Sequence, residues 1–127
     1  MKRTIFILAC IFCSMNFIWA EAQHGVVYVK AGAVGDGSSW TNAMGDIQAA
    51  ITKAKEDGAN RKDVWVAGGN FTLTANIIMQ DSINVYGSFA GTETSLEERA
   101  KVENGKAWEF VNPTILTGNG CRLASFL

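Results

Sequence analysis

The sequence contains few of the residues that build metal sites, disulfide frameworks or thiol active sites: three cysteines and one histidine in 127 residues. Cys10 and Cys13 lie in an apolar N-terminal run, so Cys121 is left without an intramolecular partner, which excludes a disulfide framework. Cys121 has no companion histidine, and His24 has no neighbouring His, Cys or Asp at ligand spacing. We therefore predict no metal, no cofactor and no cysteine nucleophile.

Basic charge is also scarce. Eleven Lys and Arg stand against twelve Asp and Glu, a net charge of −1, and no basic patch is interleaved with aromatic residues. A protein that neutralises phosphates needs such a patch, so nucleic acid is not an expected partner.

The carboxylates that could carry acid–base chemistry are isolated in the sequence, at Asp36, Asp46, Asp63 and Asp81. A pair could still form in space, but aspartates at strand ends are ordinarily turn formers. The Gly35–Ser38 stretch lacks the lysine of a phosphate loop and the alternating carboxylates of a calcium loop, so we expect a plain connector there. No catalytic residue is predicted.

Residues 1–22 have the three parts of a secretory signal peptide. These are a positive start at Lys2 and Arg3, an apolar run from Ile5 to Ile18, and a small-x-small cleavage site at Ala20–Ala22. We therefore expect export to the periplasm, the cell surface or the medium, and a single domain over residues 23–127.

Two other interpretations of this segment are weaker. Ser14 and Asn16 interrupt the apolar run, which falls short of the ~20 residues that a membrane span needs. A lipoprotein site at Ile7–Cys10 would leave an apolar region below the usual length of about 7 to 15 residues.

The stretch from Asp63 to Gly91 contains two similar apolar runs, Val64–Val66 and Ile83–Tyr86, each followed by a glycine. Overlaid at an offset of 19 residues, Val64 meets Ile83, Val66 meets Val85 and Gly68 meets Gly87. A strand-and-turn repeat of this period is typical of a stacked solenoid.

Other β-branched or apolar runs predict further strands at Val26–Val29, Phe71–Leu73 and Ile77–Met79. The last of these lacks alternation, as expected of a strand buried on both faces.

One segment has helical periodicity. Between Asn42 and Asp57 the apolar residues recur at spacings of three and four, which predicts one amphipathic helix with Thr41 or Asn42 as the N-cap and Gly58 after its end. Its mixed polar face favours packing against the strands over membrane or partner binding.

Residues 92–112 interrupt the strand rhythm, with a short helical turn after Thr94 or Ser95 and a polar loop. Insertions in solenoids map to loops on one face, often the binding face. The rhythm resumes at 113–119, where Leu116 and Gly118 occupy the places of Val85 and Gly87.

Several stretches, taken in order, resemble the N-terminal part of exported right-handed parallel β-helix proteins of the pectin-lyase-like superfamily. They are Val27–Lys30, Asp36–Trp40, Ile47–Ile51, Val64–Phe71, Val85–Ser95 and Asn112–Asn119. The resemblance implies a mostly β fold, the start of a right-handed parallel β-helix whose open end is covered by the N-terminal helix.

Members of that family continue for many further coils, and their polysaccharide-cleaving members keep the catalytic base and calcium ligands there. This chain ends within its third coil, in a tail from Gly120 to Leu127 without strand rhythm or a polar cap. We therefore expect residues 23–127 to be the capping region and first two to three coils of a longer protein, with no catalytic residue to carry over.

Two functions follow as expectations. The first is a structural or binding segment, without catalysis of its own, that associates with a polysaccharide or cell-surface glycan and with further coils of its own full-length chain. The alternative is the N-terminal fragment of a polysaccharide lyase or glycoside hydrolase whose active site lies in missing coils. Further coils with clustered acids and a basic residue would favour the enzyme.

Trp65 and Tyr86 are the candidate binding residues. If Val64, Val66 and Val85 point inward, strand alternation turns both aromatic side chains outward. Two aromatic rings on a sheet flank could form a sugar platform; packing beneath the helix or the insertion is the alternative.

We expect no turnover of acidic or neutral polysaccharides by the purified 127-residue chain. The measurement is release of unsaturated or reducing ends, and either product would contradict the expectation.

Overall fold

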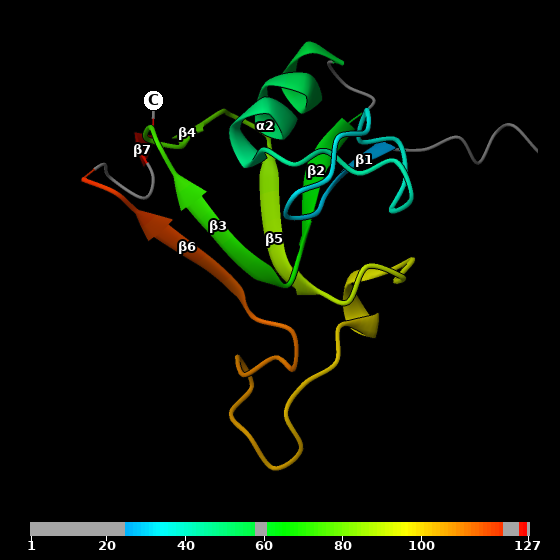
Figure 1. The fold of residues 1–127 in the computed structure, drawn as a ribbon. Coiled ribbons are helices and arrows are strands. Elements are labelled where there is room, and N and C mark those ends of the chain that lie inside the picture. Colours follow the sequence, from blue (N-terminus) through cyan, green and yellow to red (C-terminus); the bar gives the residue numbers. More distant parts are fainter. Residues whose placement is uncertain (1–24, 58–60, 121–124, 127) are drawn as a thin grey trace, which may run out of the picture.

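A computed structural model describes residues 25–57, 61–120 and 125–126. The predicted signal peptide, His24 and Cys121 therefore lie outside the described residues. The described chain is mostly β, with parallel strands and one α-helix (Figure 1). None of its helices is long and apolar enough to cross a membrane.

The largest sheet contains β1 (Gly25–Val29), β2 (Arg61–Ala67) and β5 (Asn84–Phe89), in that order and all parallel. Its inner face carries the core valines of the first two strands, because alternate side chains of a strand share one face. Those valines are all 0–1% exposed: Val27, Val29, Val64 and Val66.

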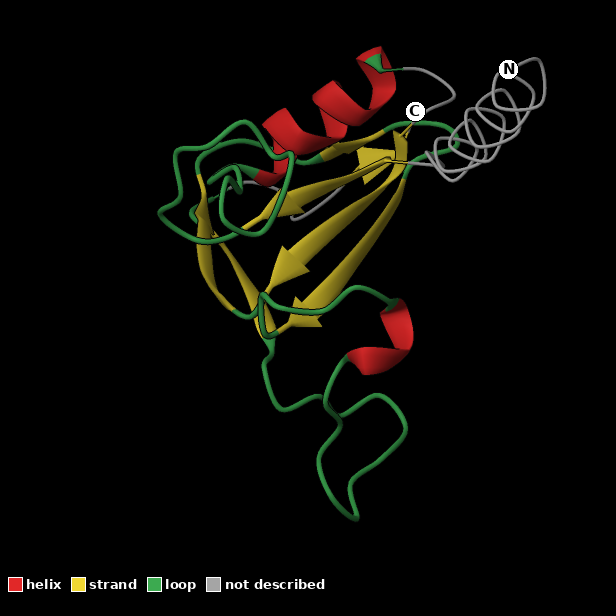
Figure 2. Cartoon of the chain, turned by 90° about the vertical axis from the view of Figure 1, so that its right-hand side faces the viewer, coloured by secondary structure: helices red, strands yellow, loops and turns green. Residues whose placement is uncertain are grey.

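Two smaller sheets face this core, each made of two parallel strands. β3 (Gly69–Leu73) pairs with β6 (Thr114–Gly118), and β4 (Ile78–Met79) pairs with β7 (Ser125–Phe126). The chain therefore visits the three sheets in turn, and strands far apart in sequence lie side by side (Figures 1 and 2).

The register of the repeat differs from the sequence prediction. Val64 lies beside Val85 and Trp65 beside Tyr86, an offset of 21 residues in place of 19. Both offsets are compatible with the inward face because a shift of two residues preserves strand alternation. Ser82, in the turn before β5, has φ 66°, and Ile83 is buried ahead of the strand.

The predicted equivalence of Leu116 with Val85 was wrong. Leu116 pairs with Phe71 of β3, in a different sheet from Val85. The segment at 92–112 carries the chain past the largest sheet, so the next strand forms on the second one. The prediction for Ile77–Met79 also needs correction, since Ile77 is buried but Ile78 is 38% exposed.

The helix is shorter than predicted. α2 spans Ile47–Glu56, and Asp46 is its N-cap, in place of Thr41 or Asn42. Met44, just before it, forms a bridge to β1: Met44 N–H donates to the Tyr28 carbonyl, and Lys30 N–H donates to the Met44 carbonyl. Backbone groups bonded to β1 are not available to a helix, which therefore begins only after Asp46.

The apolar face of α2 packs on β1 and β2, as the spacing predicted (Figure 2). Its inward residues are all buried: Ile47, Ala50, Ile51 and Ala54. Each fully buried Ile contributes about 1.5–3 kcal/mol relative to an exposed one. The helix and the three sheets thus enclose one core.

The segment at 92–112 begins with a tight turn held by a buried carboxylate. The Glu93 side chain is 6% exposed and accepts hydrogen bonds from the N–H groups of Ala90, Gly91 and Thr92. Burial raises the pKa of the Glu93 carboxyl, but these hydrogen bonds together outweigh it and keep the pKa below its ordinary range. The Glu93 carbonyl accepts a bond from Trp40 Nε1, which ties the turn to the 31–45 loop.

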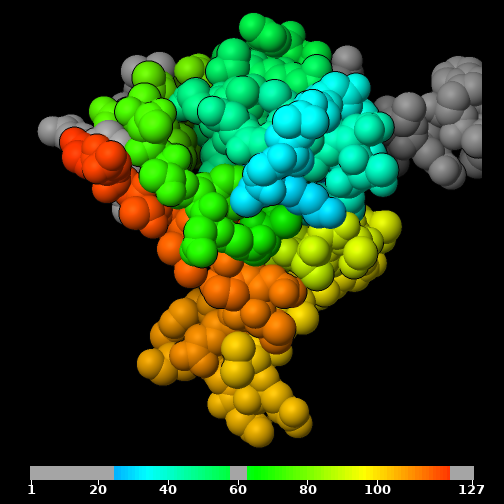
Figure 3. Space-filling view, viewed as in Figure 1, coloured from blue at the N-terminus to red at the C-terminus, as the bar shows by residue number. Residues whose placement is uncertain are grey.

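After the turn come a short 3₁₀-helix, η3 (Leu96–Glu98), as the sequence predicted, and a projecting hairpin at 100–111. The hairpin is held by backbone bonds from Val102 N–H to the Glu109 carbonyl and from Val111 N–H to the Ala100 carbonyl. Figure 3 shows it as the yellow-orange lobe that extends from the sheets.

We predict that Glu93→Gln destabilises the fold by about 1–3 kcal/mol at neutral pH, because the amide replaces one accepting oxygen by a donor that faces N–H groups. A lowered folded-state pKa gives stability that is present above the ordinary value of 4.5 and lost as the pH falls through the folded value. The deficit of the variant should therefore shrink below that pH. Urea denaturation across the pH range measures it.

Glu97→Gln is the matched control, since Glu97 is exposed in the neighbouring 3₁₀-helix. Equal stabilities of the two variants at neutral pH would contradict the structural role of Glu93.

Candidate functional site

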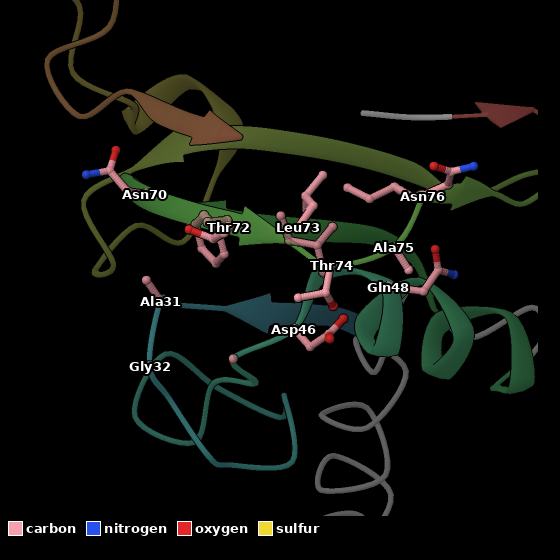
Figure 4. A pocket seen from close by; sticks show the side chains of 14 residues that line it. Ala31, Gly32, Asp46, Gln48, Asn70, Thr72, Leu73, Thr74, Ala75 and Asn76 are labelled. Atoms are coloured by element: carbon pink, nitrogen blue, oxygen red, sulfur yellow. The ribbon is translucent and has the colours of Figure 1, made fainter. Parts of the chain in front are cut away.

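A groove of about 350 Å³ lies between β3 and the segment that leads into α2 (Figure 4). Ala31, Gly32 and Gly45 form one wall, and the residues from 70 to 77 form the other. Buried Phe71 and Ile77 belong to the wall of the groove and to the core at once. The groove therefore lies directly on the hydrophobic core.

One wall presents a row of polar side chains with open hydrogen-bonding groups. Phe71 points to the core, so its neighbours Asn70 and Thr72 point outward and are exposed, and Thr74 is exposed as well. Within the described residues, none of these three side chains has a hydrogen-bond partner. Figure 4 shows Thr74 close to Asp46, with Leu73 turned to the other side of the strand.

The start of α2 supplies the other polar groups, and internal bonds fix them in place. Asp46 Oδ1 accepts a bond of 2.9 Å from Ala49 N–H, as an N-cap does. Gln48 Oε1 accepts a bond of 2.6 Å from Ile78 N–H, and Gln48 Nε2 donates to the Ile78 carbonyl. Gln48 thereby joins the helix to β4 at this end of the groove.

The groove carries little charge. Asp46 is the one ionisable residue among the described residues that line it. The groove therefore offers hydroxyls, amides and a single carboxylate, but no cation with which to neutralise an anionic ligand.

Trp65 and Tyr86 do share the outer face of the largest sheet, in register beside Tyr28. Trp65 is only 6% exposed, however, and its ring stacks on Phe89 at 4.7 Å between centroids and 11° between planes. Trp40 from the 31–45 loop also packs against this group. The ring of Trp65 is thus enclosed, and its Nε1 is buried with no hydrogen-bond partner in the described structure.

Arg99 covers the half-buried Tyr86. Its guanidinium lies 5.9 Å from the Tyr86 ring, 5.3 Å from Phe89 and 4.6 Å from Phe110. Arg99 also donates through Nη1 to the Gly87 carbonyl and through Nε to the Leu96 carbonyl. Tyr86 and Phe89 thus lie where the base of the hairpin attaches to the sheet, and Trp65 is packed beneath the neighbouring rings, as in the packing alternative.

The other aspartates are separate and have local roles. The Ser38 hydroxyl and N–H both donate to Asp36 and lower the pKa of its carboxyl. Asp63 accepts a bond from Asn84 Nδ2, and the Asp81 carbonyl accepts one from Lys55. Within the described ranges, no three His, Cys, Asp or Glu side chains form a group that could hold a metal ion.

Comparison with known proteins gave no match to a family model, to a curated protein or to a solved structure. The site is therefore interpreted from its own geometry.

The sequence prediction missed the groove residues Asn70, Thr72 and Thr74. The signal was present as a polar residue at every second position from 70 to 76. That pattern indicates one outward strand face, but only the fold brings Thr74 of this row close to Asp46 (Figure 4).

We predict that Asp46→Ala destabilises the fold by about 0.5–2 kcal/mol, through loss of the helix cap, whereas Asp46→Asn has a much smaller effect, since Asn caps about as well as Asp. Thermal unfolding of both variants measures the difference. If the two lose equal stability, the charge of Asp46 matters to the fold more than its capping bond does.

Proposed function

We propose that this protein is a saccharide-binding module of an exported protein, and that the groove beside β3 binds a neutral glycan. The observation that carries the proposal is the row formed by Asn70, Thr72 and Thr74, three exposed polar residues that line the groove, with Thr74 close to Asp46 (Figure 4). The proposal that the protein is exported rests on the first 22 residues, which have the three parts of a signal peptide.

A saccharide suits this set of groups because each sugar hydroxyl both donates and accepts a hydrogen bond. Thr hydroxyls and the Asn amide do the same, and the Asp46 carboxylate accepts. Ligand sites combine a few fixed polar groups with an apolar floor, and here Phe71 and Ile77 supply that floor.

The charge of the groove's lining residues favours a ligand without charge. A uronate chain brought against Asp46, with no Lys or Arg among the described lining residues, would meet repulsion without compensation. The groove therefore favours neutral over acidic polysaccharides.

We further propose that the three parallel sheets are the first coils of a right-handed parallel β-helix, with α2 as the cap of one end. The successive parallel pairing within three separate sheets supports this. A strand that returns to the same sheet in parallel almost always does so through a right-handed crossover. An experimental structure with left-handed crossovers would contradict this fold.

The groove should bind neutral hexasaccharides and not hexagalacturonate. We expect Thr72→Val combined with Thr74→Val to weaken binding about tenfold, because each lost hydrogen bond contributes about 0.5–1.5 kcal/mol and the valines preserve shape. Isothermal titration with cellohexaose, xylohexaose, mannohexaose and hexagalacturonate measures both effects.

Thr41→Val is the control, since Thr41 is exposed and lies outside the groove. The proposal fails if no neutral hexasaccharide binds, or if the double variant binds as well as the control does.

A further inference from the structure

A second depression adjoins the first one. It has a volume of about 330 Å³ and lies between the turn before β3 and the base of the hairpin. Its described lining residues are Gly68, Gly69, Asn70, Phe89, Ala90, Val111, Asn112, Pro113 and Ile115. Asn70 lines both depressions, so they meet at this side chain.

Gly69 lines the second depression next to Asn70, the residue that the two depressions share. Gly69 has φ 148°, and its N–H donates to the Pro113 carbonyl on the side of the second depression. A side chain at this position would extend toward Ala31 of the first groove, whose Cβ would be 3.6 Å away. Gly69 therefore lies at the place where the second depression approaches Ala31 of the first groove.

The second depression differs from the first in chemistry. It has no ionisable residue among its described lining, and two of its aliphatic side chains are substantially exposed, Val111 by 55% and Ile115 by 48%. Ile115 lies directly beside Asn70 in the register of β3 and β6. The apolar surface of Val111 and Ile115 thus adjoins the polar row of Asn70, Thr72 and Thr74 at Asn70.

We propose that the two depressions form one extended site, in which Asn70 is the central contact and Val111 with Ile115 form an outer subsite for the apolar C–H faces of further sugar units. This rests on the proposed function and specifies its ligand as a neutral chain of several residues. A disaccharide contacts the first groove alone, and a longer chain reaches both.

The test compares cellobiose with cellohexaose, and the corresponding xylose and mannose pairs, by isothermal titration. The wild-type protein should bind the hexasaccharide of the recognised series at least about fivefold more tightly than its disaccharide, since partial burial of two aliphatic side chains contributes about 1 kcal/mol. Val111→Thr combined with Ile115→Thr should remove this gain and leave disaccharide binding unchanged.

Val34→Thr is the matched control, because Val34 is 99% exposed and lines neither depression. Equal affinity of the wild type for the two lengths, or an equal loss for both lengths in the double variant, would overturn the extended site while the groove stands. If no saccharide of either length binds, the proposed function itself fails.

Discussion

Three backbone hydrogen bonds along the free edge of β1 determine much of this structure. Tyr28 N–H donates to the Gly37 carbonyl, Met44 N–H to the Tyr28 carbonyl, and Lys30 N–H to the Met44 carbonyl. They occupy the edge of the sheet, where unpaired groups would otherwise recruit another strand. They also bring the chain to Asp46 at the correct place to begin α2, and they position the loop that forms one wall of the groove. Helix, core and candidate site all depend on this edge.

The aromatic cluster shows how a surface feature of the sequence becomes interior. Trp65 faces away from the aliphatic core, yet Phe89 and Trp40 cover it and Arg99 lies over its neighbours. The loop and the insertion thus form a second layer on the outer face of the sheet. Its buried Trp65 Nε1 has no acceptor in the described structure, so the packing of the rings must offset the lost hydration of that group.

Local patterns in the sequence predicted local structure well and assembly less well. Alternation identified β1, β2 and β5 and the face of Val64 and Val66, because it depends only on which side of a strand is buried. It did not determine the pairing of Val64 with Val85, since offsets of 19 and 21 present the same face. The start of α2 was missed because Thr41 and Asn42 favour a cap in isolation, whereas in the fold Met44 is bonded to β1 and the helix begins only after Asp46. The groove brings together residues from 31 to 77, and no local pattern carries that proximity.

The hairpin at 100–111 is attached to the sheet at its base, so its base and its tip are under different structural constraints. Arg99 and Phe110 fasten its base to the sheet, while residues 102–109 extend from the rest of the molecule (Figure 3). Exposed loop tips tolerate insertion and replacement, whereas a side chain with several partners does not. We therefore expect the tip of the hairpin to tolerate changes of length and sequence, provided that Arg99 and Phe110 remain at its base.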